Sequence, residues 1–91
     1  MKERVCVIYS GEVQGVGFRY TVKYIVKSYD IAGYVKNLPD GNVEIVAEGE
    51  KSALERFLSN IRKSHLGNYI VNEDIRWQEA TGDMSIFQIR F

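Results

Sequence analysis

The chain has 91 residues, of which 45% are hydrophobic and 26% are charged. This length predicts one small globular domain over residues 1–91, and the composition excludes disordered and collagen-like classes. Twelve Lys and Arg residues balance twelve Asp and Glu residues, so the formal net charge is zero. We therefore expect no nucleic-acid partner and no anionic membrane partner, and a charged ligand would need a local site.

Cys6 is the only cysteine, which excludes an intramolecular disulfide and a cysteine zinc cluster. Because it lies in an apolar run over residues 5–9, we expect it to be buried as a small hydrophobic side chain. The apolar stretch near the N-terminus is too short for a signal peptide, and no run approaches the roughly 18 residues of a membrane-spanning helix. We expect a cytoplasmic protein.

The first predicted elements are a strand, a loop and a helix. Residues 4–10 are β-branched and aromatic and largely apolar on both faces, which is typical of an interior strand. Residues 11–17 contain three glycines, a density that breaks regular structure. From Phe18 the apolar side chains recur at helical spacing, and we expect this helix to end near Asp30 and Gly33.

A hairpin follows this helix. Residues 33–38 and 42–48 have the composition of strands, and the Pro-Asp-Gly sequence at 39–41 favours a tight turn between them. In the second strand the apolar residues alternate with polar ones. The alternation predicts that Glu44 and Glu48 lie on the face opposite the core.

A second helix and two strands complete the chain. Residues 49–51 are expected to form a loop, and Ser52 and Glu55 have the spacing of a capping box at the start of a helix. Apolar residues at helical spacing carry this helix to about Lys63. The two further strands are predicted within residues 69–79 and 86–91.

The element order therefore predicts an α+β fold. Its strands and helices follow the order β-α-β-β-α-β, with an extra short strand at the C-terminal end. This order is that of the ferredoxin-like, split βαβ sandwich, in which two helices cover one face of a mostly antiparallel sheet.

A glycine-rich segment between the first strand and the first helix is the most informative stretch for function. It consists of Gln14, Gly15, Val16, Gly17, Phe18 and Arg19. Backbone NH groups at a helix N-terminus, the helix dipole and a guanidinium together suit phosphate or carboxylate oxygens. The segment has neither the third glycine of a dinucleotide fingerprint nor the Lys-Ser/Thr of a Walker loop. From the spacing alone, a tight turn with a surface arginine remains open.

Three other polar or aromatic residues have simpler interpretations. Asn37 precedes the predicted turn, where its amide either satisfies backbone groups or both donates to and accepts from a water molecule. His65 is the only histidine, so no histidine metal site or complete catalytic triad is supported, and we expect it to be solvated or to cap a helix carbonyl. Trp77, in a strand, is expected to contribute packing.

Two segments, residues 11–19 and 33–44, resemble the signature segments of acylphosphatases. They read GEVQGVGFR and GYVKNLPDGNVE, and Gly49 also falls where that family has a glycine. The resemblance covers residues 5–62, about two thirds of the chain. Residues 64–68 depart from the family pattern, and the ending at 87–91 is only similar to it.

This resemblance implies a ferredoxin-like fold and hydrolysis of the carboxyl-phosphate bond of small acyl phosphates, without metal or cofactor. It implies that Arg19 and the amides of residues 14–19 bind the phosphate and that Asn37 positions the attacking water. The partners would be the acyl phosphate and inorganic phosphate, and we expect a monomer.

Three alternatives stay open. The first is a non-catalytic anion-binding or regulatory module of the same fold. The second is the N-terminal domain of carbamoyl-transfer maturation proteins, which also resembles acylphosphatases, although 91 residues leave no room for their further domains. The third is a nucleic-acid binder, suggested by six tyrosines and a tryptophan. The zero net charge disfavours it, as does the lack of the aromatic run of RNA-recognition domains on a central strand.

Overall fold

The computed structural model describes residues 1–91, which form one five-stranded sheet and two helices. The strands are β1 (Lys2–Gly11), β2 (Ala32–Asn37), β3 (Val43–Glu50), β4 (Ile70–Glu79) and β5 (Phe87–Arg90). The helices are α1 (Phe18–Val26) and α2 (Lys51–Lys63), and a short 3₁₀ turn spans His65–Asn68. The strand order is β4-β1-β3-β2-β5, and all neighbours are antiparallel except β2 and β5.

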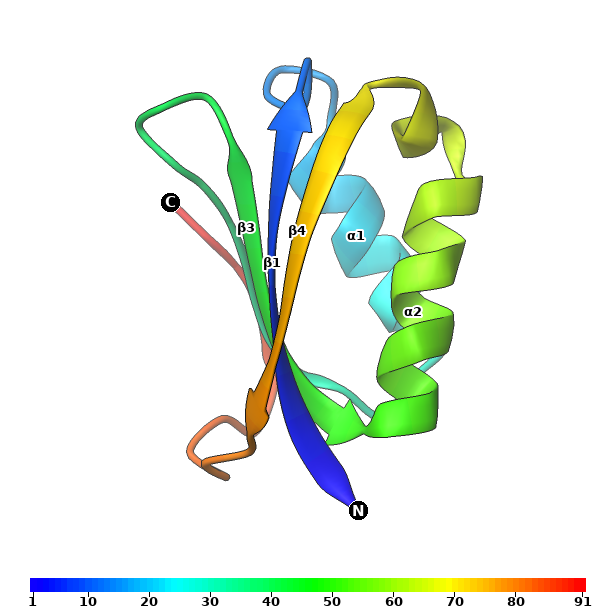
Figure 1. Cartoon of the computed structure of the whole chain (residues 1–91), viewed down its shortest axis with the longest axis vertical. Coiled ribbons are helices and arrows are strands. Elements are labelled where there is room, and N and C mark those ends of the chain that lie inside the picture. Colours follow the sequence, from blue (N-terminus) through cyan, green and yellow to red (C-terminus); the bar gives the residue numbers. More distant parts are fainter.

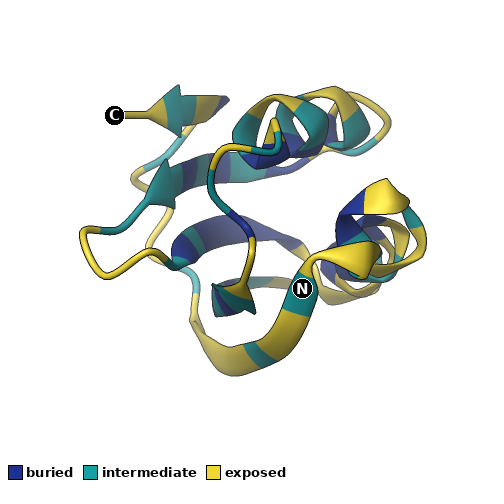
Figure 2. Ribbon diagram, turned by 90° about the horizontal axis from the view of Figure 1, so that it is seen from above, coloured by how far each residue is buried: buried dark blue, intermediate teal, exposed yellow.

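Both helices lie on one face of the sheet, and the other face has no helix over it (Figure 1). Figure 2 shows the buried residues where the sheet and the helices face each other. Eighteen buried residues form a single hydrophobic core there. The predicted ferredoxin-like α+β fold, with a mostly antiparallel sheet, is confirmed. Neither helix has the length and apolar character needed to cross a bilayer.

Strand β1 is interior, as its composition predicted, because it pairs with β3 on one side and β4 on the other. Val5, Val7 and Tyr9 point toward the helices and are completely buried. The prediction that Cys6 is buried was wrong, because the thiol is only partly covered. Side chains alternate along a strand, so Cys6 must point to the face that no helix covers, where its Sγ lies 3.7 Å from Gln78 Oε1.

The predicted loop at 49–51 and the capping box at Ser52 were also wrong. Strand β3 stays paired with β1 as far as Glu50, and α2 begins directly at Lys51. Glu50 is the N-cap in extended conformation, and no side chain caps the helix. Its carboxylate instead pairs with the amino group of Met1. Ser52 is therefore already inside the helix and cannot cap it.

Helix α1 is shorter than predicted, because it ends at Val26 rather than near Asp30 or Gly33. Gly33 lies inside β2 with φ at 148°, and a Cβ there would be 1.9 Å from the carbonyl oxygen of Val46. The periodicity of the apolar residues did not reveal this close contact between two strands. The close approach of the Val46 carbonyl explains why a glycine occurs inside β2.

Glu44 and Glu48 lie on the face opposite the core, as predicted, but Glu48 is buried with 6% exposure. Its carboxylate accepts hydrogen bonds from Arg4 Nε at 2.7 Å, Thr81 N at 2.9 Å and Gly82 N at 3.0 Å. Burial acts to raise the pKa of Glu48, but these hydrogen bonds outweigh it and lower the pKa to about 2. Through these hydrogen bonds the carboxylate holds residues 81–82, which follow β4, against the sheet.

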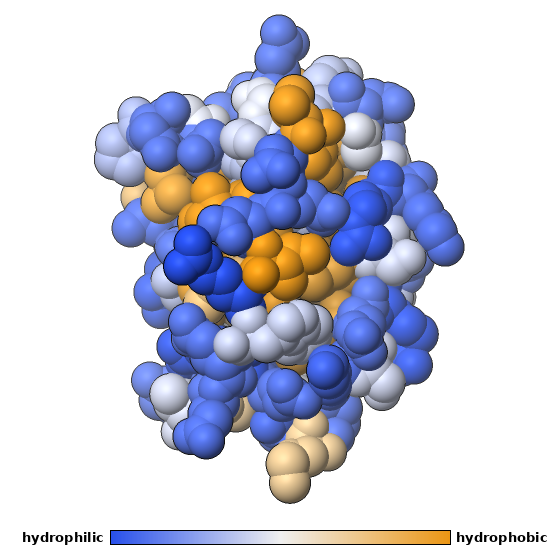
Figure 3. Space-filling model, in the orientation of Figure 1, coloured by the Kyte–Doolittle hydropathy of each residue, from blue (hydrophilic) through white to orange (hydrophobic).

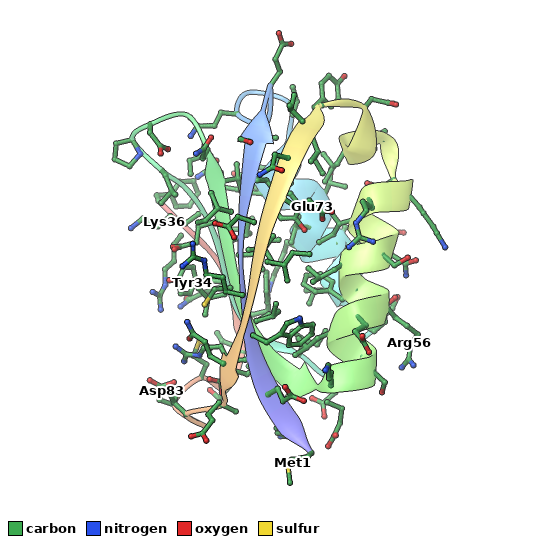
Figure 4. The ribbon with its side chains drawn as sticks, viewed as in Figure 1. Met1, Tyr34, Lys36, Arg56, Glu73 and Asp83 are labelled. Atoms are coloured by element: carbon green, nitrogen blue, oxygen red, sulfur yellow. The ribbon has the colours of Figure 1, made fainter.

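Strand β4 is an edge of the sheet and exposes several apolar side chains. Val71, Ile75 and Trp77 are 83%, 36% and 37% exposed, and hydrophobic side chains reach the surface among hydrophilic ones in Figure 3. The ammonium of Lys51 lies 5.2 Å from the centre of the Trp77 ring. The stick view shows Glu73, also on β4, between the sheet and α2, where it pairs with Arg62 (Figure 4).

Candidate active site

The glycine-rich loop owes its shape to two glycines with positive φ. Gly15 has φ of 80° and Gly17 has φ of 75°, and no residue other than glycine has a positive φ in this chain. A Cβ on either glycine would meet nothing within 4 Å. These positions therefore require glycine for its backbone conformation rather than for space. Gly17 is also the N-cap of α1, so the loop leads directly into the helix.

The amides of this loop and of the first helical turn have no backbone acceptors. None of the NH groups of residues 15–20 donates to a backbone carbonyl, and the first backbone bond of this region runs from Thr21 N to Gly17 O. Free NH groups at a helix N-terminus carry the positive end of the helix dipole. The first helical turn contains no acidic side chain that would compete for them.

Gln14 connects this loop to the hairpin that follows β2. Its Nε2 donates to the carbonyl oxygen of Leu38 at 2.8 Å and to that of Asn42 at 2.9 Å. The two carbonyls belong to residues on either side of the β2–β3 turn. The Gln14 side chain therefore sets the distance between the loop and the end of β2, where Asn37 lies.

A hollow of about 270 Å³ brings most of the predicted site residues together. Its predicted lining residues are Gly15, Gly17, Phe18, Arg19 and Asn37. Gln14 and Val16 do not line it, because Gln14 is bonded to the hairpin and Val16 packs against the core. No Asp, Glu, His or Lys side chain lines this hollow, so Arg19 is the only charged group in its wall.

The side chain of Arg19 is held by the last two residues of the chain. Its Nη1 donates to the carbonyl oxygen of Arg90 at 3.4 Å, and its Cζ lies 4.6 Å from the centre of the Phe91 ring. These residues reach the site because β5 runs parallel to β2, with Arg90 paired to Lys36 beside Asn37. The motif-based prediction missed both contacts, since local sequence carries no signal for a pairing this distant.

Sequence reasoning also missed two residues in the wall of the hollow, Val13 and Tyr20. Both are direct neighbours of the predicted loop. The sequence feature that could have indicated Tyr20 as a wall residue is its position directly after Arg19. His65 is exposed outside this hollow. Larger hollows elsewhere, such as one of about 570 Å³ between the C-terminal parts of the two helices, contain neither Arg19 nor Asn37. No group of three or more His, Cys, Asp and Glu side chains is placed to hold a metal ion.

Known proteins match this chain over almost its whole length. The profile of the family described as Acylphosphatase matches residues 5–89. An acylphosphatase from Methanospirillum hungatei is 48% identical over 89 residues, covering 97% of each chain. The crystal structure of acylphosphatase from Bacillus subtilis has a TM-score of 0.89 and 33% identity, with both chains fully covered. A structure of full-length HypF, in the phosphate- and nucleotide-bound form, has a TM-score of 0.90 and 29% identity but matches over 12% of its own chain.

The fold and these matches define a small α+β hydrolase. The chain belongs to the acylphosphatase family, and its enzyme class is that of an acylphosphatase. The family match continues to residue 89, so the region after residue 62, where the recognisable motifs end, also belongs to the family domain.

Proposed function

We propose that this enzyme hydrolyses the carboxyl-phosphate bond of small acyl phosphates, giving a carboxylate and inorganic phosphate. The observation that carries the proposal is that one hollow is lined by Asn37, by Arg19 and by residues 15, 17, 18 and 20, whose backbone NH groups, like that of Arg19, donate to no backbone carbonyl. An acyl phosphate has a carboxylate leaving group and is already activated. Positioning of the water and the phosphate, together with stabilisation of the charge in the transition state, is therefore sufficient for much of the rate acceleration.

The phosphate would bind to Arg19 and to the loop amides. A guanidinium has planar donors that match two phosphate oxygens, and the amides at the start of α1 add donors with fixed directions. In phosphoryl transfer the charge is spread over the three equatorial oxygens of the transition state. The contacts of Arg19 with Arg90 and Phe91 hold the guanidinium at the site before substrate binds.

Asn37 would orient the attacking water. Its side-chain amide both donates and accepts hydrogen bonds, but it is not a base at neutral pH. No carboxylate or imidazole lines the hollow, so the proton of the water passes to a phosphate oxygen of the substrate. We propose that neither metal nor cofactor takes part, and that the enzyme acts as a cytoplasmic monomer.

The test is phosphate release from benzoyl phosphate in the presence of a chelator. We expect the enzyme to turn over without added metal. Asn37→Ala should bind inorganic phosphate as before but lose at least about a hundredfold in kcat, because only the water loses its partner. Arg19→Lys should weaken phosphate inhibition and turnover together, because an ammonium cannot reproduce the guanidinium fork. Asn68→Ala and Arg56→Lys alter exposed residues outside the hollow and are the matched controls.

Full activity of Asn37→Ala would exclude the role in water positioning. An unchanged inhibition constant for phosphate in Arg19→Lys would exclude the role in binding. A wild-type protein that binds phosphate but releases none from benzoyl phosphate would instead be a non-catalytic anion-binding module.

A further inference from the structure

Tyr20 is a large aromatic residue that the core does not use. It lies directly after Arg19 in the first turn of α1 and is 63% exposed. Its ring does not belong to the hydrophobic core, and it forms no aromatic pair and no cation–π contact. The residue nevertheless lines the same hollow as Arg19 and Asn37. It is the only exposed aromatic side chain in that wall.

A second hollow, of about 470 Å³, shares Tyr20 with the hollow that contains Arg19 and Asn37. Tyr20 is the one residue that lines both hollows. The remaining residues around the second hollow are Thr21, Tyr24, Ile25, Ser64 and His65. No Lys, Arg, Asp or Glu lines it, and half of its side chains are hydrophobic. This lining suits an uncharged organic group rather than a second phosphate.

The chemistry of the proposed reaction directs the acyl group to this side. In an in-line displacement the leaving oxygen lies opposite the attacking water, and the water lies at Asn37 on β2. On the β5 side, the Arg90 carbonyl and the Phe91 ring already cover the guanidinium of Arg19. On the side of α1, the exposed Tyr20 lines the hollow.

We propose that Tyr20 is a specificity-determining residue, whose ring packs against the acyl group and gives the enzyme a preference for aromatic acyl phosphates over acetyl phosphate. This inference rests on the proposed hydrolysis of acyl phosphates. An aromatic acyl group stacks on the tyrosine ring or meets it edge-on, whereas an acetyl group offers one methyl. The contact exists equally in the bound substrate and in the transition state. It therefore lowers KM for the aromatic substrate and leaves kcat unaffected.

The experiment compares kcat/KM for benzoyl phosphate and acetyl phosphate in the wild type, Tyr20→Ala, Tyr20→Leu and Tyr20→Phe. We expect Tyr20→Ala to reduce the benzoyl-to-acetyl ratio about five- to tenfold, mainly through KM for benzoyl phosphate. Tyr20→Leu should reduce the ratio less, and Tyr20→Phe should preserve it, because the ring and not the hydroxyl makes the contact. Tyr69→Ala, at an exposed tyrosine that lines neither hollow, is the matched control and should keep the ratio.

Three outcomes would overturn the inference in different ways. A wild type that is active on both substrates, with a ratio that Tyr20→Ala leaves intact, removes the role of Tyr20 and leaves the proposed function standing. A wild type that hydrolyses neither substrate removes the proposed function and this inference with it. A loss of ratio that appears in kcat alone would also contradict the packing role.

Discussion

The side-chain Nε2 of Gln14 donates to the carbonyl oxygen of Leu38 at 2.8 Å, and this bond joins two segments that are 24 residues apart. One segment holds the free backbone amides and the other follows Asn37. The hydrogen bond thus couples the proposed phosphate site to the proposed water site, although Gln14 itself does not line the hollow.

Gln14→Ala removes both bonds to the hairpin and leaves the carbonyls of Leu38 and Asn42 without this donor. We expect a loss of about 1–2 kcal/mol in the free energy of unfolding, because two hydrogen bonds are lost. The fall in kcat should be about ten- to a hundredfold, because the loop and Asn37 lose their fixed distance. Urea denaturation and benzoyl phosphate kinetics measure the two effects. Gln88→Ala, at an exposed glutamine of β5, is the control, and equal kcat values for the two variants would refute the coupling.

The variants Gly17→Ala and Gly33→Ala distinguish two reasons why a position requires glycine: a positive φ at Gly17, and a lack of space for a Cβ at Gly33. At Gly17 only the φ of 75° is unfavourable, so alanine should cost about 1–2 kcal/mol and leave the protein folded. At Gly33 a Cβ would collide with the backbone of Val46 at 1.9 Å, so alanine should cost well over about 3 kcal/mol. Thermal unfolding of both variants checks this order. Similar melting temperatures would show that the contact in the sheet relaxes easily.

The stability of the protein should depend on pH through Glu48. Its pKa is lowered from 4.5 to about 2 in the folded protein, so folding is favoured by the ionised form. The stabilisation is complete above the unfolded pKa and disappears as the pH falls from about 5 toward 2, with a total of about 3 kcal/mol. Urea denaturation of the wild type and Glu48→Gln at pH 7 and pH 3 should show a difference that shrinks at the lower pH. Glu55→Gln removes an exposed carboxylate as control, and a pH-independent difference for Glu48→Gln would contradict the assignment.

Phe91→Ala removes the ring that lies against the Arg19 guanidinium. Because exposed cation–π contacts contribute about 0.5–1 kcal/mol, we expect phosphate inhibition and kcat/KM to weaken about two- to fivefold. Phe91→Tyr keeps a ring face and should behave as the wild type, whereas Phe91→Leu keeps apolar bulk and should resemble alanine. Inhibition constants for inorganic phosphate distinguish these cases. Wild-type constants for Phe91→Ala would show that the ring does not position Arg19.

Local patterns predicted the fold because the periodicity of apolar residues is a local property. The interior position of β1, the β2–β3 hairpin and both helices follow from side-chain spacing and turn residues that are close in sequence. The two glycines at 15 and 17 likewise predicted the loop, since their need for positive φ arises within the loop itself. These are the features for which each local preference agrees with the global fold.

The predictions failed where distant segments meet. The alternation predicted the face of Glu48 correctly, but nothing near it in sequence indicates that residues 81–82 donate to its carboxylate or that it is buried. The capping box failed because pairing with β1 extends β3 to Glu50 and moves the start of α2. In the site, Phe91 and Arg90 escaped notice for the same reason. Their proximity to Arg19 depends on the parallel pairing of β2 with β5.

That parallel pairing also has a kinetic consequence. Strand β5 is the last element of the chain, yet it completes the surroundings of a residue in the first helix. Sheets dominated by pairings distant in sequence fold slowly, in milliseconds to seconds, because loops must close before contacts form. During refolding, helical structure should therefore be regained before enzymatic turnover. Because Phe87 of β5 is itself part of the hydrophobic core, recovery of full activity reports completion of the core together with the pairing of the last strand.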